Sequence, residues 1–214
     1  MGKAVWGTSG GFQGKNGANI GRWRNGDNIV GPLPHPSLVP PTTALINVRT
    51  KFSLVSTFLG WISPLIKIGF RDERVGNQSA MNVAFSYNYR NALTGVAPSF
   101  AIDYPEVRFS QGKLGYPYNP GLATTEDAQL DLTWDATISG FYGGPTDLAT
   151  ILVYNPAKQM FVTRIGAAVR SVLSYDLALP VNFSGDMVHV YMSFVSADGE
   201  MVSDSIYVGG TVVQ

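Results

Sequence analysis

The sequence predicts an α+β protein whose modules follow one another along the chain. Three observations predict this: glycine and proline crowd the first residues, apolar residues then recur at helical spacing, and later they alternate with polar ones. These patterns divide the 214 residues into an extended Gly/Pro-rich N-terminal arm (1–41), a helical hairpin (42–95), a connector (96–126) and a C-terminal antiparallel immunoglobulin-like β-sandwich (127–214).

Turn signals and prolines define the arm. Five prolines between residues 32 and 41 exclude a helix and favour extended chain. A flexible linker has no need of the large aromatic residues Trp6, Phe12 and Trp23, so we expect an arm that docks on its own body or on a neighbouring subunit. The turn signals in it are Gly10-Gly11, Asn16-Gly17 and Asn25-Gly26.

The strongest helical pattern covers residues 43–70. Its apolar residues form two neighbouring stripes, and a face this wide is buried on more than one side. Pro64 lies inside the pattern and predicts a kink. The uncharged run 52–66 is shorter than the about 20 residues of a membrane span, so we expect no transmembrane helix. The stripes are Leu45, Val48, Phe52, Val55, Leu59, Ile62 and Ile66, and beside them Leu54, Phe58, Trp61, Leu65 and Ile68.

Residues 78–93 predict a second helix, which Gly95 ends and which folds back on the first. From about residue 100 onward the period is two, and the sandwich is expected from residue 127. The alternation over residues 128–135 predicts a half-buried strand with Trp134 in the core. Residues 148–154 and 188–194 predict further strands, and Asp198-Gly199 predicts a two-residue hairpin back through residues 201–208. Short strands between turn signals are typical of an immunoglobulin-like sandwich.

Few residues point to catalysis. The chain has no cysteine, which excludes thiol nucleophiles, disulfides and cysteine metal sites. Its two histidines are His35, between prolines, and His189, on the polar side of a strand, where a surface or half-buried role is the ordinary one. Gly14-Lys15 is no phosphate loop, because Asn16 stands where Ser or Thr is needed. We therefore expect no enzyme, no catalytic residue, no metal and no cofactor.

Charge is sparse and unevenly distributed. Charged residues make up 14% of the chain, against about 25% in ordinary globular domains, which favours a surface that partners cover. Residues 1–75 hold nine basic and three acidic residues, a net charge of +6, and the remainder carries −6. Such asymmetry is typical of nucleic-acid contact or of charge-matched association. A chance difference between two modules stays open.

Two sets of residues are candidate binding groups. For assembly the candidates are Trp6, Phe12, Arg22, Trp23, Arg24, Phe52, Phe58 and Trp61. Within this set Arg22-Trp23-Arg24 fits two interpretations, single-stranded nucleic-acid binding or a docking arm stabilised by cation–π contacts. The second set consists of aromatic residues in Gly/Pro-rich loops, with packing within the loops as the alternative: Tyr116, Tyr118, Phe141 and Tyr142.

Seven segments in order resemble the DUF6266 family, a family of uncharacterised proteins from Bacteroidetes. The resemblance covers nearly the whole chain and implies a host lineage but no activity. The LPHPSLVPP segment departs from it, since it is less basic than the family's arm. The segments are SGGFQGKNG, KFSLVSTFLGWISPLIKIGF, MNVAFSYNYRNALTG, IDYPEVRFSQGKL, LVYNP, FSGDMVHVYMSFVSADG and VSDSIYVG.

These observations favour a non-enzymatic, self-assembling structural protein, such as a virion or surface-filament subunit, whose arm docks on a neighbour in a homo-oligomer or larger assembly. The alternative is a module that binds a glycan or a protein through its sandwich loops. The N-terminus shows no apolar run of secretory type, which leaves the localisation open, with cytoplasm or virion as the expectation.

Overall fold

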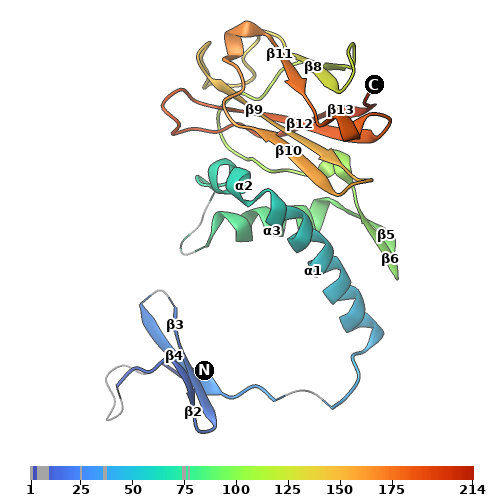
Figure 1. Cartoon of the computed structure of the whole chain (residues 1–214). Coiled ribbons are helices and arrows are strands. Elements are labelled where there is room, and N and C mark those ends of the chain that lie inside the picture. Colours follow the sequence, from blue (N-terminus) through green and yellow to red (C-terminus); the bar gives the residue numbers. More distant parts are fainter. Residues whose placement is uncertain (1, 4–9, 25, 36–37, 74–75, 77) are drawn as a thin grey trace. The chain divides into compact units, whose positions relative to one another are not determined.

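The computed structural model describes residues 2–3, 10–24, 26–35, 38–73, 76 and 78–214. It divides into two compact units, Met1–Thr42 and Thr43–Gln214 (Figure 1). The boundary lies one residue beyond the end of the predicted arm.

The N-terminal unit is a small antiparallel sheet, so the prediction of an extended arm is wrong for residues 14–32. The Asn-Gly signals close hairpins: Gly17 and Gly26 adopt φ of +58° and +83° at the two tight turns. Residues 33–35 and 38–42 have no regular structure. The strands β1 (Gly2–Lys3), β2 (Gly14–Asn16), β3 (Asn19–Arg24) and β4 (Asp27–Pro32) lie in the order β1-β4-β3-β2.

The second unit begins with three helices, α1 (Thr43–Trp61), α2 (Ser63–Gly69) and α3 (Ala80–Asn91). The kink predicted at Pro64 is a full break at Ile62, where the axes of α1 and α2 meet at 85°. Pro64 lies in the first turn of α2, where a missing N–H costs nothing. Ser79 caps α3 by accepting a hydrogen bond from the Asn82 amide, at 3.2 Å. Within the described residues, no single helix is both long and apolar enough to cross a membrane.

A hairpin and a two-sheet sandwich follow the helices. The hairpin pairs β5 (Leu93–Val96) with β6 (Ser99–Ile102) and leads into the short helix η1 (Tyr104–Glu106). One sheet has the order β10-β9-β12-β13 and the other β11-β8-β7, which is an antiparallel immunoglobulin-like arrangement. The strands are β7 (Gly121–Ala123), β8 (Gln129–Thr133), β9 (Leu148–Asn155), β10 (Met160–Arg164), β11 (Ser174–Ala178), β12 (Met187–Val195) and β13 (Ile206–Val212).

Strands β9 and β12 are buried on both faces. Their inner residues, such as Val153 and Val190, pack against the second sheet. Their outer residues, such as Leu152 and Tyr191, pack against the helices. This explains why the sequence of β9 reads as a nearly continuous apolar run and not as an alternation. The helices therefore share a core with the sandwich.

The loop after β12 is longer than the two-residue hairpin that the sequence predicts. The Ser196 amide donates to the Met201 carbonyl at 2.9 Å around Asp198-Gly199, yet β13 begins only at Ile206. The intervening residues turn toward the segment that follows α3, where the Ser205 amide donates to the Ser110 carbonyl at 2.9 Å. The Ser203 carbonyl accepts from the Ser110 hydroxyl at 2.6 Å, so residues 203–205 tie the sandwich to that segment.

Candidate assembly surfaces

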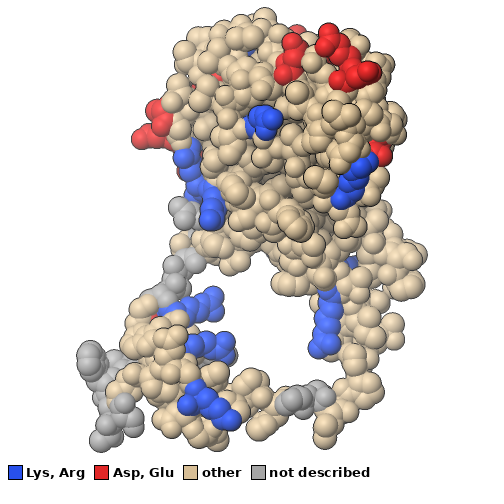
Figure 2. All heavy atoms as spheres, viewed as in Figure 1, with Lys and Arg blue, Asp and Glu red and all other residues tan. Residues whose placement is uncertain are grey.

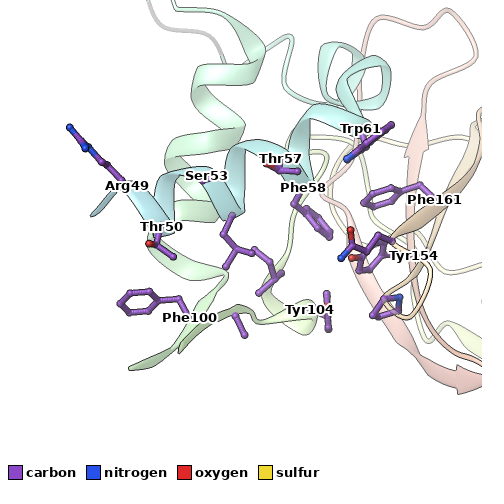
Figure 3. A pocket seen from close by; sticks show the side chains of 15 residues that line it. Arg49, Thr50, Ser53, Thr57, Phe58, Trp61, Phe100, Tyr104, Tyr154 and Phe161 are labelled. Atoms are coloured by element: carbon purple, nitrogen blue, oxygen red, sulfur yellow. The ribbon is translucent and has the colours of Figure 1, made fainter. Parts of the chain in front are cut away.

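A groove of about 760 Å³ runs beside α1 within the second unit (Figure 3). Three separate segments contribute its walls: α1 itself, the chain from β6 into η1, and the turn between β9 and β10. Figure 3 shows Arg49, Thr50 and Phe100 at one end and Trp61, Phe161 and Tyr154 at the other. The lining residues are Arg49, Thr50, Ser53, Leu54, Thr57, Phe58, Trp61, Phe100, Ala101, Ile102, Tyr104, Tyr154, Pro156, Gln159 and Phe161.

Interlocking aromatic rings form the floor of the groove at its Trp61 end. The ring of Phe58 meets those of Tyr154 and Phe161 edge-on, at 5.1 and 5.2 Å between centroids, and the latter two stack at 4.5 Å. These are the favoured geometries of aromatic pairs. Phe58 is buried, whereas Trp61 at the rim is 71% exposed. The floor is therefore held in place by packing, and the rim presents a large ring to solvent.

The charge at the groove is positive. Among the described residues that line it, Arg49 alone has a basic or acidic side chain, and the hydroxyls of Thr50, Ser53 and Thr57 supply other polarity along α1. The ammonium group of Lys51 lies over the ring of Phe100, at 4.6 Å from its centroid, and adds a second positive charge beside the groove. Burial raises the pKa of Tyr104 and raises that of Tyr154 to about 12, so both phenols stay neutral. An aromatic floor with hydroxyls and positive charge binds flat or apolar groups, and it contains no nucleophile paired with a base.

His189 packs behind Tyr104, one of the residues that line the groove. Its ring stacks on Tyr104 at 4.1 Å between centroids, and its Nδ1 lies 2.9 Å from the Tyr207 hydroxyl. Burial lowers the pKa of His189. The Tyr191 hydroxyl donates to the Tyr104 carbonyl at 2.8 Å, which fixes η1 on β12. His189 is thus half-buried and holds a wall of the groove in place.

The four loop aromatics singled out in the sequence lie in two segments that run side by side, 114–118 and 135–147, together called the aromatic loop here. The Gly115 amide donates to the Tyr142 carbonyl at 2.7 Å, and the Asp135 amide donates to the Tyr118 carbonyl at 3.0 Å. The Ser139 hydroxyl donates to the Tyr116 carbonyl at 2.8 Å. Tyr116, Tyr118 and Tyr142 are exposed, and the side chain of Phe141 is fully exposed.

A buried ion pair anchors the aromatic loop from inside. Arg170 is only 2% exposed, and its Nη2 lies 3.1 Å from Oδ2 of Asp147 and donates to the Gly115 carbonyl at 2.6 Å. Its guanidinium also stacks over the Phe194 ring, at 3.8 Å from the centroid. Burial lowers the pKa of Arg170, and Asp147 offsets part of that effect. The sequence carries no signal for this pair, because the two residues lie 23 positions apart in separate loops.

In the N-terminal sheet the register separates the basic residues from the tryptophan. Successive residues of a strand point to opposite faces, so Arg22 and Arg24 share one face and Trp23 lies on the other. The Trp23 ring lies against Gly11, where a Cβ atom would come within 2.7 Å of it. The sheet therefore presents the two arginines and the tryptophan on different faces, and nucleic-acid binding by this segment stays a prediction.

The remaining assembly candidates separate into different environments. Phe12 packs on Gly21 in the N-terminal sheet, and its carbonyl accepts a hydrogen bond from Asn28 at 2.8 Å. Phe52 on α1 is half-exposed, and its ring lies 4.7 Å from that of Phe85. Trp6 lies outside the described residues. The groove therefore brings together Phe58 and Trp61 from the predicted set, and it adds Tyr104, Tyr154 and Phe161.

The model of one protein family, "Family of unknown function (DUF6266)", matches residues 11–209. The chain belongs to the DUF6266 family. The Bacteroidetes lineage that the resemblance implies stays a prediction, because the family match names no organism. No curated protein matches this DUF6266 chain. In its described residues, no group of three or more His, Cys, Asp or Glu side chains is placed to hold a metal ion.

Solved structures similar to this DUF6266 protein include two human fibronectin type III domains. The fn3 domain of the collagen alpha-1(XX) chain has 17% identity and a TM-score of 0.32, and the match covers 49% of this chain and 88% of that one. The fn3 domain of contactin 1 has 11% identity and a TM-score of 0.33, with 56% and 94% covered. The sandwich architecture rests on the strand order described above.

Proposed function

We propose that this DUF6266 protein is a non-enzymatic structural subunit that assembles with copies of itself, as virion and surface-filament subunits do. The observation that carries the proposal is the apolar surface along α1. Leu45, Ile46, Val48 and Phe52 are 42–55% exposed, and Trp61 is 71% exposed beside the groove. Leu45, Val48 and Phe52 recur at spacings of three and four, so they share one face of α1, whereas Trp61 lies on the opposite face, which borders the groove. Exposed apolar residues gathered on one face mark interaction sites.

The position of this surface supports a protein partner. The N-terminal half of α1 extends beyond α3 (Figure 1), and the residues of Thr43–Phe52 are exposed except for Asn47 and Lys51. Fully burying a large apolar side chain contributes about 1.5–3 kcal/mol, so covering one that is already half-buried contributes about half of that. Several such side chains on one helix therefore supply a favourable contact without any change of fold.

The N-terminal unit supports the same proposal. It folds as a compact sheet of its own, and irregular chain that contains the fully exposed Leu38 joins it to α1. A small unit on an irregular connection is suited to docking on a neighbouring subunit. The basic face of its sheet, with Lys15, Arg22 and Arg24, adds charge to that contact.

Light scattering coupled to size-exclusion chromatography tests the proposal. The expected result is a mass well above the 23.0 kDa of one chain, increasing with concentration. Val48→Ser combined with Phe52→Ser should lower that mass, whereas Val181→Ser, at an exposed position in the turn between β11 and β12, should not. A 23.0 kDa particle at every concentration would contradict the proposal.

A second candidate is a module that binds a glycan or a protein through the aromatic loop. One observation favours it: Phe141 is fully exposed on a loop that Arg170 holds rigid. Glycan-array binding that disappears with Phe141→Ser in a monomeric protein would favour this candidate over assembly.

A further inference from the structure

We infer that the aromatic loop of one copy docks, through Phe141, into the α1 groove of the next copy, so that the subunits assemble head to tail. The inference rests on the proposed function and names the contact by which assembly proceeds. It follows from the placement, the shape and the charge of the two surfaces.

The two surfaces lie at opposite ends of one strand. The aromatic loop ends at Asp147, and β9 begins at the next residue, Leu148. Beyond the other end of β9, Pro156 and Gln159 line the groove. Eight strand residues at about 3.4 Å each separate the two by roughly 25 Å. One subunit can therefore use both surfaces at once, each with a different neighbour.

The aromatic loop presents Phe141 as a projection that is already formed in the free subunit. Gly140 and Gly143 adopt φ of +115° and +155° on either side of Phe141, which turns its ring outward. Arg170 fixes the base of the loop through Gly115 and Asp147. Because the loop is already ordered, little conformational freedom is lost when it binds. Tyr142, the next residue in the chain, and Tyr116, on the paired segment, are also exposed.

The groove is a matching acceptor for that ring. Its floor of Phe58, Tyr154 and Phe161 is rigid and aromatic, so a further ring can pack edge-on or offset against it. Trp61 at the rim would cover the inserted side chain. The hydroxyls of Ser53 and Thr57 lie along the helix wall within reach of a loop backbone.

The charges of the two surfaces are opposite. Of the described residues that line the groove, Arg49 is the one with a charged side chain, and Lys51 lies over Phe100 beside it. The aromatic loop contains no Lys or Arg, and it presents Asp135, since its other carboxylate is paired with Arg170. The contrast extends further, because residues 43–110 hold seven basic and four acidic residues and residues 111–214 hold four and ten. Figure 2 shows a basic side chain along α1, and it shows the acidic side chains of this unit over the sandwich, where a few basic ones also lie.

Charge and placement together select the head-to-tail arrangement over a two-fold one. A contact of groove with groove would bring two Arg49 side chains together, and a contact of loop with loop would bring two Asp135 side chains together. A contact of loop with groove pairs opposite signs, which sets orientation and the rate of encounter. Such a heterologous contact propagates into a ring or an open filament, depending on whether the rotation between neighbours closes.

Two point variants of the full-length protein, each of which removes one side of the contact, test the inference. Phe141→Ser removes the projection and leaves the groove intact. Thr57→Trp fills the groove at an exposed helix position and leaves the projection intact. Each variant alone should remain at 23.0 kDa, and an equimolar mixture should give a particle of twice that mass and no larger, because one working loop and one working groove remain. Val181→Ser should assemble as the wild type does.

The outcomes separate this contact from assembly in general. If the wild type assembles and either Phe141→Ser or Thr57→Trp alone reaches the wild-type mass, the contact lies elsewhere. The inference is then wrong, and the proposed function stands. A mixture that stays at 23.0 kDa also overturns the inference. If the wild type itself remains a single chain, both the inference and the proposed function fail. Circular dichroism of each variant verifies that its fold is intact.

Discussion

At the residue scale, Trp134 is the largest side chain between the two sheets. It is 3% exposed, its ring meets Phe194 edge-on at 6.0 Å, and its Nε1 donates to the Arg170 carbonyl at 2.7 Å. Trp134→Ala should lower the free energy of unfolding by about 3–5 kcal/mol, because a large cavity remains. Chemical denaturation measures this. Trp134→Phe, which keeps most of the packing, should cost less, and a cost near zero for Ala would contradict the burial.

Arg170 provides a second test at this scale. Arg170→Met leaves the Asp147 carboxylate and the Gly115 carbonyl without their main partner in a buried place. Removing one member of a buried ion pair costs about 3–5 kcal/mol. Arg170→Met combined with Asp147→Asn should be more stable than Arg170→Met alone, since no unpaired charge remains. If the single variant unfolds at the wild-type denaturant concentration, the pair has no structural role.

His189 should make stability depend on pH. Burial lowers its pKa in the folded protein, so below about pH 6.5 the unfolded chain binds a proton more readily than the folded one. The contribution is complete above pH 6.5 and is lost as the pH falls through the lowered value. The free energy of unfolding should therefore decrease from pH 7 to pH 5, and His189→Gln should reduce that slope. His35→Gln, at an exposed position, should leave the slope unchanged.

At the element scale, the helices and the strands with apolar periodicity were predictable, and the polar strands of the N-terminal sheet were not. The alternation of β8 placed Leu130, Leu132 and Trp134 correctly in the core. The strands β2, β3 and β4 carry few apolar residues, so their Asn-Gly hairpins looked like turns in an extended arm. Pro64 was recognised as a disturbance, but whether it kinks a helix or begins a new one depends on packing that the sequence does not reveal.

The groove was predictable only in part, for a physical reason. Phe58 and Trp61 belong to a helical stripe, which periodicity identifies. Tyr104, Tyr154 and Phe161 reach the same place from a short helix and two strands, and only tertiary folding brings them together. The aromatics of the loop were recognisable because Gly and Pro surround them. Arg170 was not, because a lone arginine in a loop is ordinarily solvated.

The N-terminal unit can be tested as an element. Deleting residues 1–42 should leave the second unit folded, because that unit has its own helical and sandwich cores. It should weaken oligomerisation, because a docking unit is lost. Circular dichroism and sedimentation velocity measure the two effects. A truncated chain that no longer unfolds cooperatively would show instead that the sheet is part of the core of its own subunit.

At the scale of the whole molecule, salt should act on the rate of assembly more than on its end point. The first 75 residues carry +6 and the remainder −6. Raising salt from 0.1 to 1 M shortens the Debye length from about 10 Å to about 3 Å, which removes the steering between opposite charges. Completed assemblies should persist, because apolar burial is not screened. Stopped-flow light scattering across a salt series measures the rate.

Retention of nucleic acid during purification distinguishes binding of DNA or RNA by the basic sheet from assembly of the protein with itself. A basic sheet that binds DNA or RNA loses affinity log-linearly with salt, whereas protein assembly through an aromatic contact does not. If the assembly rate is indifferent to salt and no nucleic acid co-purifies, the uneven charge has no role in either process.

The position of β9 has a mechanical consequence for a head-to-tail filament. Tension would enter each subunit near Asp147 and leave near Asn155, along the axis of a single strand that is hydrogen-bonded to β10 on one side and β12 on the other. Force in this direction loads both ladders in shear, so their hydrogen bonds resist together instead of opening one after another. The strand at the centre of the fold, β9, would then carry the tension from one subunit of the filament to the next.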